Sequence, residues 1–196
     1  MSNPLNTHWS MVRRILRYLS GTSKLGLLLS PANPNVALSL RAYSDSDWAN
    51  DPDDRRSTSG TCIFIGPNLI SWSSKKQTLV ARSSAEAEYR ALAHTTSELL
   101  WLESLLAELR VKYFSPTLLC NNLSVVLLSH NPILHARTKH IELDIHFVRE
   151  RVMANKLKIQ HVTASAQLAD IMKKPLSSAN FQDLRNKLKV VLLPPH

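Results

Sequence analysis

The order of strand and helix patterns along the chain constrains its fold more than any other sequence feature. Short apolar segments typical of strands come first, a long helix pattern follows, and strand and helix patterns then alternate. A single sheet flanked by helices buries the apolar side of every element in such an order, so we predict a mixed α/β fold. The predicted strands are Leu25–Ser30, Val36–Ser44, Thr61–Ile65, Leu69–Ser73, Thr78–Arg82, Thr117–Cys120 and Leu157–Val162.

The predicted helices show apolar residues at intervals of three and four. The longest begins at Ser83-Ser84-Ala85-Glu86, which fits a capping box, because a serine side chain can accept a free N–H while the glutamate reaches back. We expect this helix to continue, with room for a break, to Val111. The other predicted helices are Trp9–Leu19, Leu123–Ser129, Ile141–Val152, Gln167–Met172 and Ala179–Leu188.

The N-terminal residues form a predicted extension of one globular domain. The amphipathic helix Trp9–Leu19 meets a stop at Gly21, and Pro31-Ala32-Asn33-Pro34 then separates two predicted strands, so we expect a hairpin there. We divide the chain into a connecting segment at 1–35, a domain at 36–190 and a C-terminal tail at 191–196.

The chain is basic, with 24 lysines and arginines against 15 aspartates and glutamates and a formal net charge of +9. An excess of positive charge favours a polyanionic partner such as nucleic acid. No apolar run approaches the roughly 20 residues of a membrane helix, and the N-terminus lacks an apolar signal segment. We therefore expect a soluble, intracellular protein without a membrane partner. Cys62 and Cys120 have no metal-ligand spacing around them, so we expect free thiols.

Four side chains with oxygen ligands lie where predicted strands end or helices begin. They are Asp45, Glu88, Asn121 and Asp170. Ends of strands next to helix starts are where α/β sheets gather ligands, and hard cations such as Mg²⁺ prefer oxygen. Two ions held about 3.5–4 Å apart can clamp the attacking and leaving oxygens of a phosphoryl displacement. The pattern therefore favours a nuclease, although each acidic residue taken alone is more often a solvated surface group.

Several sequence motifs of consecutive residues resemble the ribonuclease H region of copia-type retrotransposon polyproteins. The resemblance runs from Trp9 to Leu188. The motifs are Tyr43-Ser44-Asp45-Ser46-Asp47-Trp48-Ala49, Asp54-Arg55-Arg56-Ser57-Thr58-Ser59-Gly60, Ile70–Gln77, Ala81–Leu92, Arg137–Ile141, His146–Glu150, Gln167–Ile171 and Lys174-Pro175-Leu176.

The resemblance implies a five-stranded ribonuclease H-like sheet and Mg²⁺-dependent cleavage of the RNA strand in RNA–DNA hybrids. It implies two Mg²⁺ ions, for which Mn²⁺ can substitute, held by Asp45, Glu88, position 121 and Asp170. The family has an aspartate at the third position, where this chain has Asn121. An amide offers a carbonyl oxygen but no charge, so we expect impaired activity.

Alternatives remain beside this interpretation. Asp47 could replace Asp45 as the first ligand, although the resemblance aligns Asp45 there, and Glu86 competes with Glu88, although capping accounts for Glu86. A catalytically inactive, retroelement-derived module with a nucleic-acid-binding or structural role is the second hypothesis. An integrase-like strand-transfer enzyme is compatible with the carboxylates but not with the sequence motifs given above.

Basic side chains near the acidic positions are the predicted contacts to nucleic acid. They are Arg55, Arg56, Lys75, Lys76, Arg137 and Lys139. Such contacts go to phosphates, whereas a hybrid is recognised by its shape and its 2′-hydroxyl groups. A solvated basic surface is the alternative. The resemblance also implies a reverse transcriptase domain of the same polyprotein as a partner, and a location in a cytoplasmic virus-like particle or in the nucleus.

Overall fold

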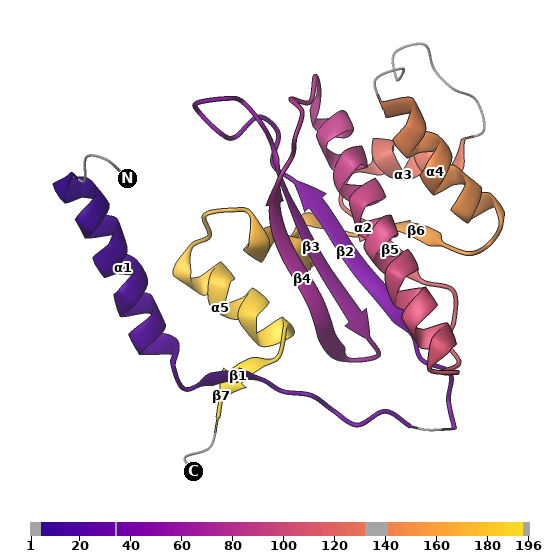
Figure 1. The fold of residues 1–196 in the computed structure, drawn as a ribbon, viewed down its shortest axis with the longest axis horizontal. Helices are drawn as coiled ribbons and strands as arrows, with labels where there is room; N and C mark the ends of the chain where they lie inside the picture. Colours follow the sequence, from indigo (N-terminus) through magenta and orange to yellow (C-terminus); the bar gives the residue numbers. More distant parts are fainter. Residues whose placement is uncertain (1–4, 34, 132–140, 194–196) are drawn as a thin grey trace.

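The computed structural model describes residues 5–33, 35–131 and 141–193. Its centre is a five-stranded sheet in the order β4-β3-β2-β5-β6 (Figure 1). Strands β2, β3 and β4 are antiparallel neighbours, while β5 is parallel to both β2 and β6. The strands are β2 at Leu40–Ser46, β3 at Thr58–Ile65, β4 at Asn68–Lys76, β5 at Thr117–Cys120 and β6 at Lys158–His161. The predicted fold class is confirmed.

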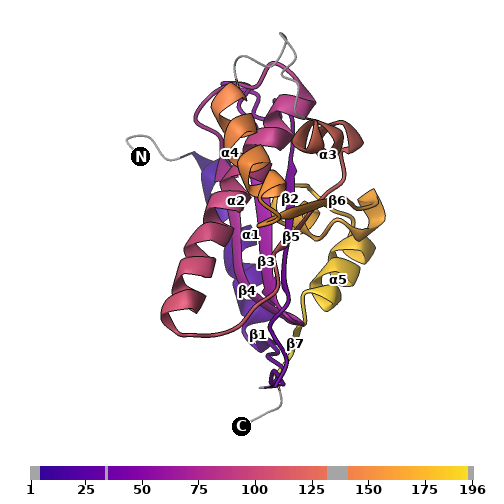
Figure 2. The ribbon, with the colours of Figure 1, turned by 90° about the vertical axis from the view of Figure 1, so that its right-hand side faces the viewer.

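Helices cover both faces of this sheet (Figure 2). The long helix α2, backed by α4, packs on one face, and the short 3₁₀ segment η3 together with α5 covers the other. Helix α3 follows β5 and contacts α4. The bounds are α2 at Ser84–Glu108, α3 at Leu123–His130, α4 at Glu142–Met153, η2 at Ala164–Ala166, η3 at Leu168–Met172 and α5 at Ser178–Lys187.

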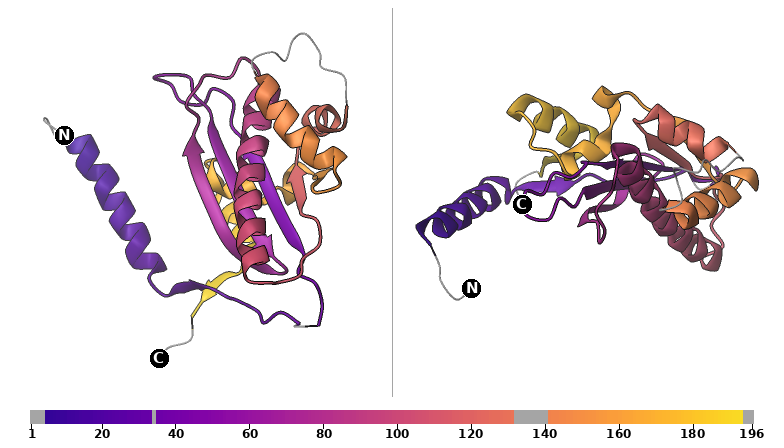
Figure 3. Two further views of the ribbon diagram at one scale, coloured as in Figure 1. Left: turned by 45° about the vertical axis from the view of Figure 1, so that its right-hand side comes forward. Right: turned by 90° about the horizontal axis from the view of Figure 1, so that it is seen from above.

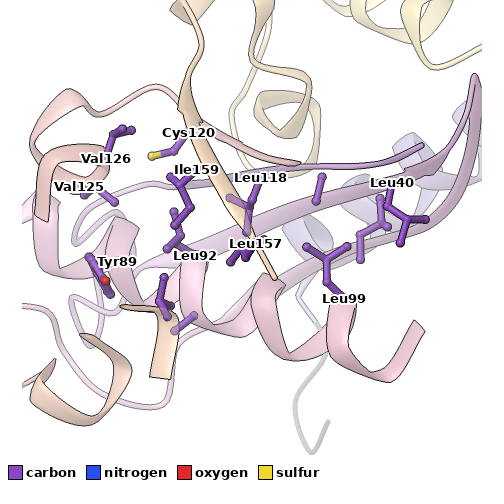
Figure 4. Close-up of a cluster of buried hydrophobic side chains, with 14 of the residues drawn as sticks. Leu40, Tyr89, Leu92, Leu99, Leu118, Cys120, Val125, Val126, Leu157 and Ile159 are labelled. Atoms are coloured by element: carbon purple, nitrogen blue, oxygen red, sulfur yellow. The ribbon is translucent and has the colours of Figure 1, made fainter. Parts of the chain in front are cut away.

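Alternation along β3 divides the core between the two faces. Ile63 joins the larger cluster under α2, which Figure 4 shows with Leu92, Leu99 and Leu118, whereas Cys62 belongs to the smaller cluster with residues of η3 and α5. Both sides of β3 are therefore apolar and buried. Such burial on two faces stabilises the central strands, at about 1.5–3 kcal/mol for each large side chain.

Helix α2 runs without a break for 25 residues. Its N-cap follows the predicted chemistry in part, since Ser83 Oγ accepts a hydrogen bond from the Glu86 N–H at 3.2 Å. The Glu86 carboxylate, however, accepts from the Arg82 N–H at 2.9 Å rather than from the cap residue itself. The start of the helix is thus fixed at Ser84, four residues before Glu88.

The predicted strand at Thr78–Arg82 was wrong. These residues form the loop between β4 and α2, and the side chains of Leu79 and Val80 are exposed. The indole Nε1 of Trp48 donates to the carbonyl oxygen of Ala81 at 3.0 Å, so this carbonyl group is satisfied by a side chain and needs no strand partner.

The predicted N-terminal hairpin was also wrong. Strand β1, Leu25–Leu27, pairs antiparallel with β7, Val190–Leu192, rather than with the segment after residue 35. Ser30 then exchanges two hydrogen bonds, each of 2.8 Å, with the side chain of Asn68 in β4. The pairing of β1 with β7 and the contact of Ser30 with Asn68 thus take the place of the predicted hairpin.

Helix α1, Asn6–Thr22, projects from the rest of the structure (Figures 1 and 3). None of its side chains is buried, and Trp9, Ile15 and Leu19 are each more than half exposed. The Arg13 guanidinium lies 5.6 Å from the ring centroid of Trp9. In the described ranges, no helix is both long and apolar enough to cross a membrane.

Candidate active site at the ends of the central strands

Asp45 and Asn121 lie at the same edge of the sheet. Strands β2 and β5 are parallel, and Tyr43 stands opposite Leu119, so two residues further along Asp45 and Asn121 follow in register. Parallel strands end together, which is why such an edge gathers functional groups. Asp45 is 3% exposed, and its Oδ1 accepts a hydrogen bond from the Ser46 N–H at 2.7 Å.

Asp170 reaches this edge because η3 packs closely against β2 and β3. Gly60 is the register partner of Asp45, and a Cβ atom on Gly60 would lie 2.6 Å from the carbonyl oxygen of Ala169. The fully buried Gln167 donates from Nε2 to the carbonyl oxygen of Ser44 at 3.0 Å. The absence of a side chain at Gly60 and the buried amide of Gln167 therefore place the turn that carries Asp170 beside Asp45.

Two lysines of the same turn pair with the two aspartates. The Lys173 Nζ lies 2.8 Å from Asp45 Oδ2 and 3.3 Å from Asp170 Oδ1, and its side chain is 1% exposed. Lys174 Nζ lies 2.8 Å from the same oxygen of Asp170, and its side chain is 40% exposed. We call Asp45, Asp170 and Lys173 the buried cluster.

Burial and charge shift the pKa values of the two aspartates in opposite directions. Burial raises the pKa of Asp45, as does its neighbour Asp170, and the two ammonium groups offset only part of that rise. Burial also raises the pKa of Asp170, but its interactions with Asp45 and the two lysines outweigh this, so the pKa of Asp170 falls. Of the two carboxyl groups, Asp45 is the one that keeps a proton to higher pH.

Glu88 lies on the second turn of α2 and faces the end of β5. Its Oε1 accepts a hydrogen bond from Asn122 Nδ2 at 3.1 Å, and the Cys120 Sγ lies 3.8 Å from its Oε2. Burial raises the pKa of Glu88, and the negative charge of Asp45 raises it further.

The oxygen donors suit a hard divalent cation. The Oδ1 atom of Asn121 is buried and accepts no hydrogen bond from any described residue, as expected for an oxygen that is available as a ligand. Nevertheless, no three His, Cys, Asp or Glu side chains within 5–33, 35–131 and 141–193 converge into a cluster that could hold a metal ion. The space between Asp45 and Asp170 contains the Lys173 ammonium group instead.

The alternative carboxylates have other partners. Asp47 accepts hydrogen bonds from the Thr58 N–H and from Asn50 Nδ2, so it braces the loop after β2. Glu86 bonds the Arg82 N–H and pairs with Arg90 at 2.8 Å. Both groups stabilise the backbone around the site.

A second set of charges joins the loop between β2 and β3 to the end of β4. Lys76 Nζ lies 2.6 Å from Asp51 Oδ2 and 2.9 Å from Asp54 Oδ2, and its side chain is 43% exposed. We call Asp51, Asp54 and Lys76 the exposed cluster. Asp51 accepts hydrogen bonds from Lys76 and from two backbone N–H groups, and these bonds lower the pKa of Asp51 to about 2.

The predicted nucleic-acid contacts differ in their surroundings. Arg56 pairs with Asp54 at 3.5 Å and Lys76 belongs to the exposed cluster, whereas Arg55 and Lys75 are exposed. These contacts remain predictions. Arg137 and Lys139 lie outside the described residues.

Several residues that build the site were not predicted from the sequence. Gln77 donates from Nε2 to Ser59 Oγ at 3.0 Å and to the carbonyl oxygen of Ala87 at 2.8 Å, so it joins β3 to α2. No sequence pattern indicates this role or that of Gln167. Lys173 and Lys174 did leave a signal, because they follow Asp170 by three and four residues, the spacing at which side chains meet on a helical turn.

Comparisons with known proteins agree with this geometry. No protein-family model matches the chain. Over all 196 residues it is 47% identical to the retrovirus-related Pol polyprotein from transposon RE2 of Arabidopsis thaliana, of which it spans 13%. The chain thus corresponds to a small part of the relatives that it matches.

Solved structures share its fold. LC11-RNase H1, crystallised with an RNA/DNA hybrid, matches with a TM-score of 0.52 and 16% identity over 69% of this chain and 94% of its own. A foamy viral protease-reverse transcriptase, also with an RNA/DNA hybrid, matches with a TM-score of 0.52 and 13% identity over 87% of this chain and 26% of its own. The chain is therefore homologous to a short region of retrovirus-related Pol polyproteins from copia-type transposons, and it has the ribonuclease H fold.

Proposed function

We propose that this chain is a divalent-metal-dependent ribonuclease H that cleaves the RNA strand of RNA–DNA hybrids during reverse transcription of a retrotransposon. The observation that carries the proposal is the meeting of Asp45 and Asp170 at the end of β2, with Glu88 bonded to Asn122 just beyond the end of the neighbouring strand β5. The fold shared with LC11-RNase H1 and the Pol relatives support it.

The residues that would hold divalent ions are Asp45, Glu88, Asn121 through its Oδ1, and Asp170. Mg²⁺ or Mn²⁺ there would supply positive charge at the attacking and leaving oxygens of the scissile phosphodiester. The protein fixes the donors in advance, because the Ser46 N–H orients Asp45 and Asn122 orients Glu88. Asn121 adds no negative charge, so we expect weaker ion binding and slower turnover than an aspartate there would give.

The substrate would be held by its phosphates. Arg55 and Lys75 are exposed near the acidic edge and carry the charge that such contacts need, while Lys76 and Arg56 would exchange their aspartate partners for phosphate. Binding of this kind weakens steeply with salt. A reverse transcriptase domain of the same polyprotein is the proposed protein partner, and the proposed location is a cytoplasmic virus-like particle or the nucleus.

A second candidate is a module that binds hybrids without cutting them. Two observations favour it: an amide occupies position 121, and the Lys173 ammonium lies between Asp45 and Asp170. Either feature lowers the affinity for divalent ions while leaving the basic surface intact.

The decisive experiment restores the carboxylate with Asn121→Asp and measures cleavage of a labelled RNA–DNA hybrid in Mg²⁺ or Mn²⁺. We expect a rise in rate of about tenfold or more, equivalent to about 1.4 kcal/mol of activation free energy. Asn180→Asp is the matched control, because it makes the same change on the exposed first turn of α5. Its rate should equal that of the unchanged chain.

The outcomes separate the two candidates. No gain from Asn121→Asp would show that position 121 is not the missing ligand. Saturable hybrid binding without cleavage in both forms would favour the binding module, whereas rapid cleavage by the unchanged chain would exclude it.

A further inference from the structure

The ammonium group of Lys173 is the least solvent-exposed charge at the acidic edge. Its side chain is 1% exposed, against 40% for the neighbouring Lys174. A buried lysine is costly to desolvate and is tolerated when carboxylates surround it. Lys173 meets that condition only because Asp45 and Asp170 both face it, so the three side chains form one interdependent unit.

The oxygens that contact Lys173 are the ones a bridging metal ion would need. Lys173 reaches Oδ2 of Asp45, whose other oxygen is already occupied by the Ser46 N–H, and Oδ1 of Asp170. A divalent ion between these two oxygens would occupy the same place as the ammonium nitrogen. Two cations cannot share that place, because their repulsion in a buried site is strong.

We propose that Lys173 is a built-in cation that fills the bridging position between Asp45 and Asp170, so that a divalent ion binds there only when the lysine leaves. This inference rests on the metal site of the proposed function. It deepens that function by assigning to Lys173 the control of metal affinity. Lys174 supports the exchange, since it keeps an ion pair with Asp170 at 2.8 Å from the solvent side.

Charge balance leads to the same conclusion. The two carboxylates of Asp45 and Asp170 face the two ammonium groups of Lys173 and Lys174, which leaves no unbalanced negative charge on this pair for an incoming ion. Asn121 contributes none. The unchanged chain therefore binds Mg²⁺ and Mn²⁺ weakly, and removal of Lys173 strengthens binding.

The test measures Mn²⁺ binding to the full chain without nucleic acid, and the electron paramagnetic resonance signal of free Mn²⁺ reports how much ion remains unbound. Lys173→Met keeps the length of the side chain and removes its charge, and we expect its Mn²⁺ dissociation constant to fall about tenfold or more. Lys158→Met is the matched control, because Lys158 is an exposed lysine of β6 and its loss changes the net charge equally. An unchanged constant in Lys173→Met, or equal tightening in both variants, would overturn the proposal.

Thermal unfolding gives a second readout. In EDTA we expect Lys173→Met to unfold roughly 10 °C below the unchanged chain, because the buried Asp45 loses its nearest cation and Asp170 keeps only Lys174. Saturating Mg²⁺ should restore most of that loss, while it should hardly shift the unchanged chain. If Lys173→Met fails to fold in EDTA, folding on addition of Mg²⁺ supports the proposal, and failure of both Lys173→Met and Lys173→Thr to fold in Mg²⁺ contradicts it.

Neither measurement depends on cleavage. Tighter Mn²⁺ binding by Lys173→Met without cleavage by the double variant Lys173→Met/Asn121→Asp would leave the inference standing and reject the enzymatic function. Cleavage by Asn121→Asp with unchanged Mn²⁺ binding by Lys173→Met would do the reverse.

Discussion

The buried cluster and the exposed cluster have the same composition and nearly the same geometry. Each joins two aspartates to one lysine, with shortest nitrogen–oxygen distances of 2.8 Å and 2.6 Å. They differ in solvent, because the lysine side chain is 1% exposed in the first and 43% exposed in the second. Distance alone therefore does not rank ion pairs, and access to water decides whether a pair is structural or incidental.

Removal of each lysine gives the largest expected contrast. In EDTA at neutral pH, Lys173→Met should lower the free energy of unfolding by about 3–5 kcal/mol, because it removes the nearest cation from the buried Asp45 and leaves Asp170 with Lys174 alone. Lys76→Met should leave the stability within experimental error, since water solvates Asp51 and Asp54 in its place. Urea denaturation of both variants checks this. Comparable losses in the two would refute the role assigned to burial.

A smaller effect should follow from a change in the packing that forms the buried cluster. Gly60→Ala would place a Cβ 2.6 Å from the carbonyl oxygen of Ala169, a contact that forces η3 away from β3. We expect a loss of about 1–3 kcal/mol, typical of overpacking. Gly21→Ala in α1 is the control, because nothing lies within 4 Å of its Cβ and alanine favours helices. A Gly60→Ala variant as stable as its parent would show that η3 can shift freely.

The smallest contrast concerns pH. The pKa of Asp51 is lowered to about 2 from 3.8, so its contribution to stability is present above pH 3.8 and is lost as the pH falls towards 2. Burial raises the pKa of Asp45, so the folded state holds its proton longer and stability declines as the pH rises through that pKa. The free energy of unfolding should be measured as a function of pH in EDTA. Asp51→Asn should reduce the loss of stability at acid pH, and Asp45→Asn should reduce the decline in stability as the pH rises. The same change of slope in both variants would contradict these opposite shifts.

The architecture could be predicted from the sequence because the patterns that indicate strands and helices are local, and because the resemblance rests on long sequence motifs. The continuous apolar run Cys62–Ile65 is typical of a strand buried on both faces, and the serine cap at Ser83 marks where α2 begins. The acidic positions followed from the ends of those elements. Pairing partners are not local, and for that reason Leu25–Leu27 was paired with the wrong segment.

The lysine inside the acidic edge shows the other limit of sequence interpretation. The spacing from Asp170 to Lys173 predicts that the two side chains can meet, but not that the lysine is buried. That burial depends on Gly60, which lets η3 approach, and on Gln167, which anchors η3 to β2. These contacts join segments more than 100 residues apart, so only the folded structure reveals them.

The pairing of β1 with β7 makes the fold nearly circular. Leu25 stands opposite Leu192, and the Leu193 N–H donates to the carbonyl oxygen of Lys24 at 2.8 Å, so the two strands enter and leave the domain at one point. A short loop joining them, with the chain reopened at the exposed β3–β4 turn, would give a permuted protein with the same sheet order. The order of the elements along the gene is thus less important for this fold than the closure that these two three-residue strands provide.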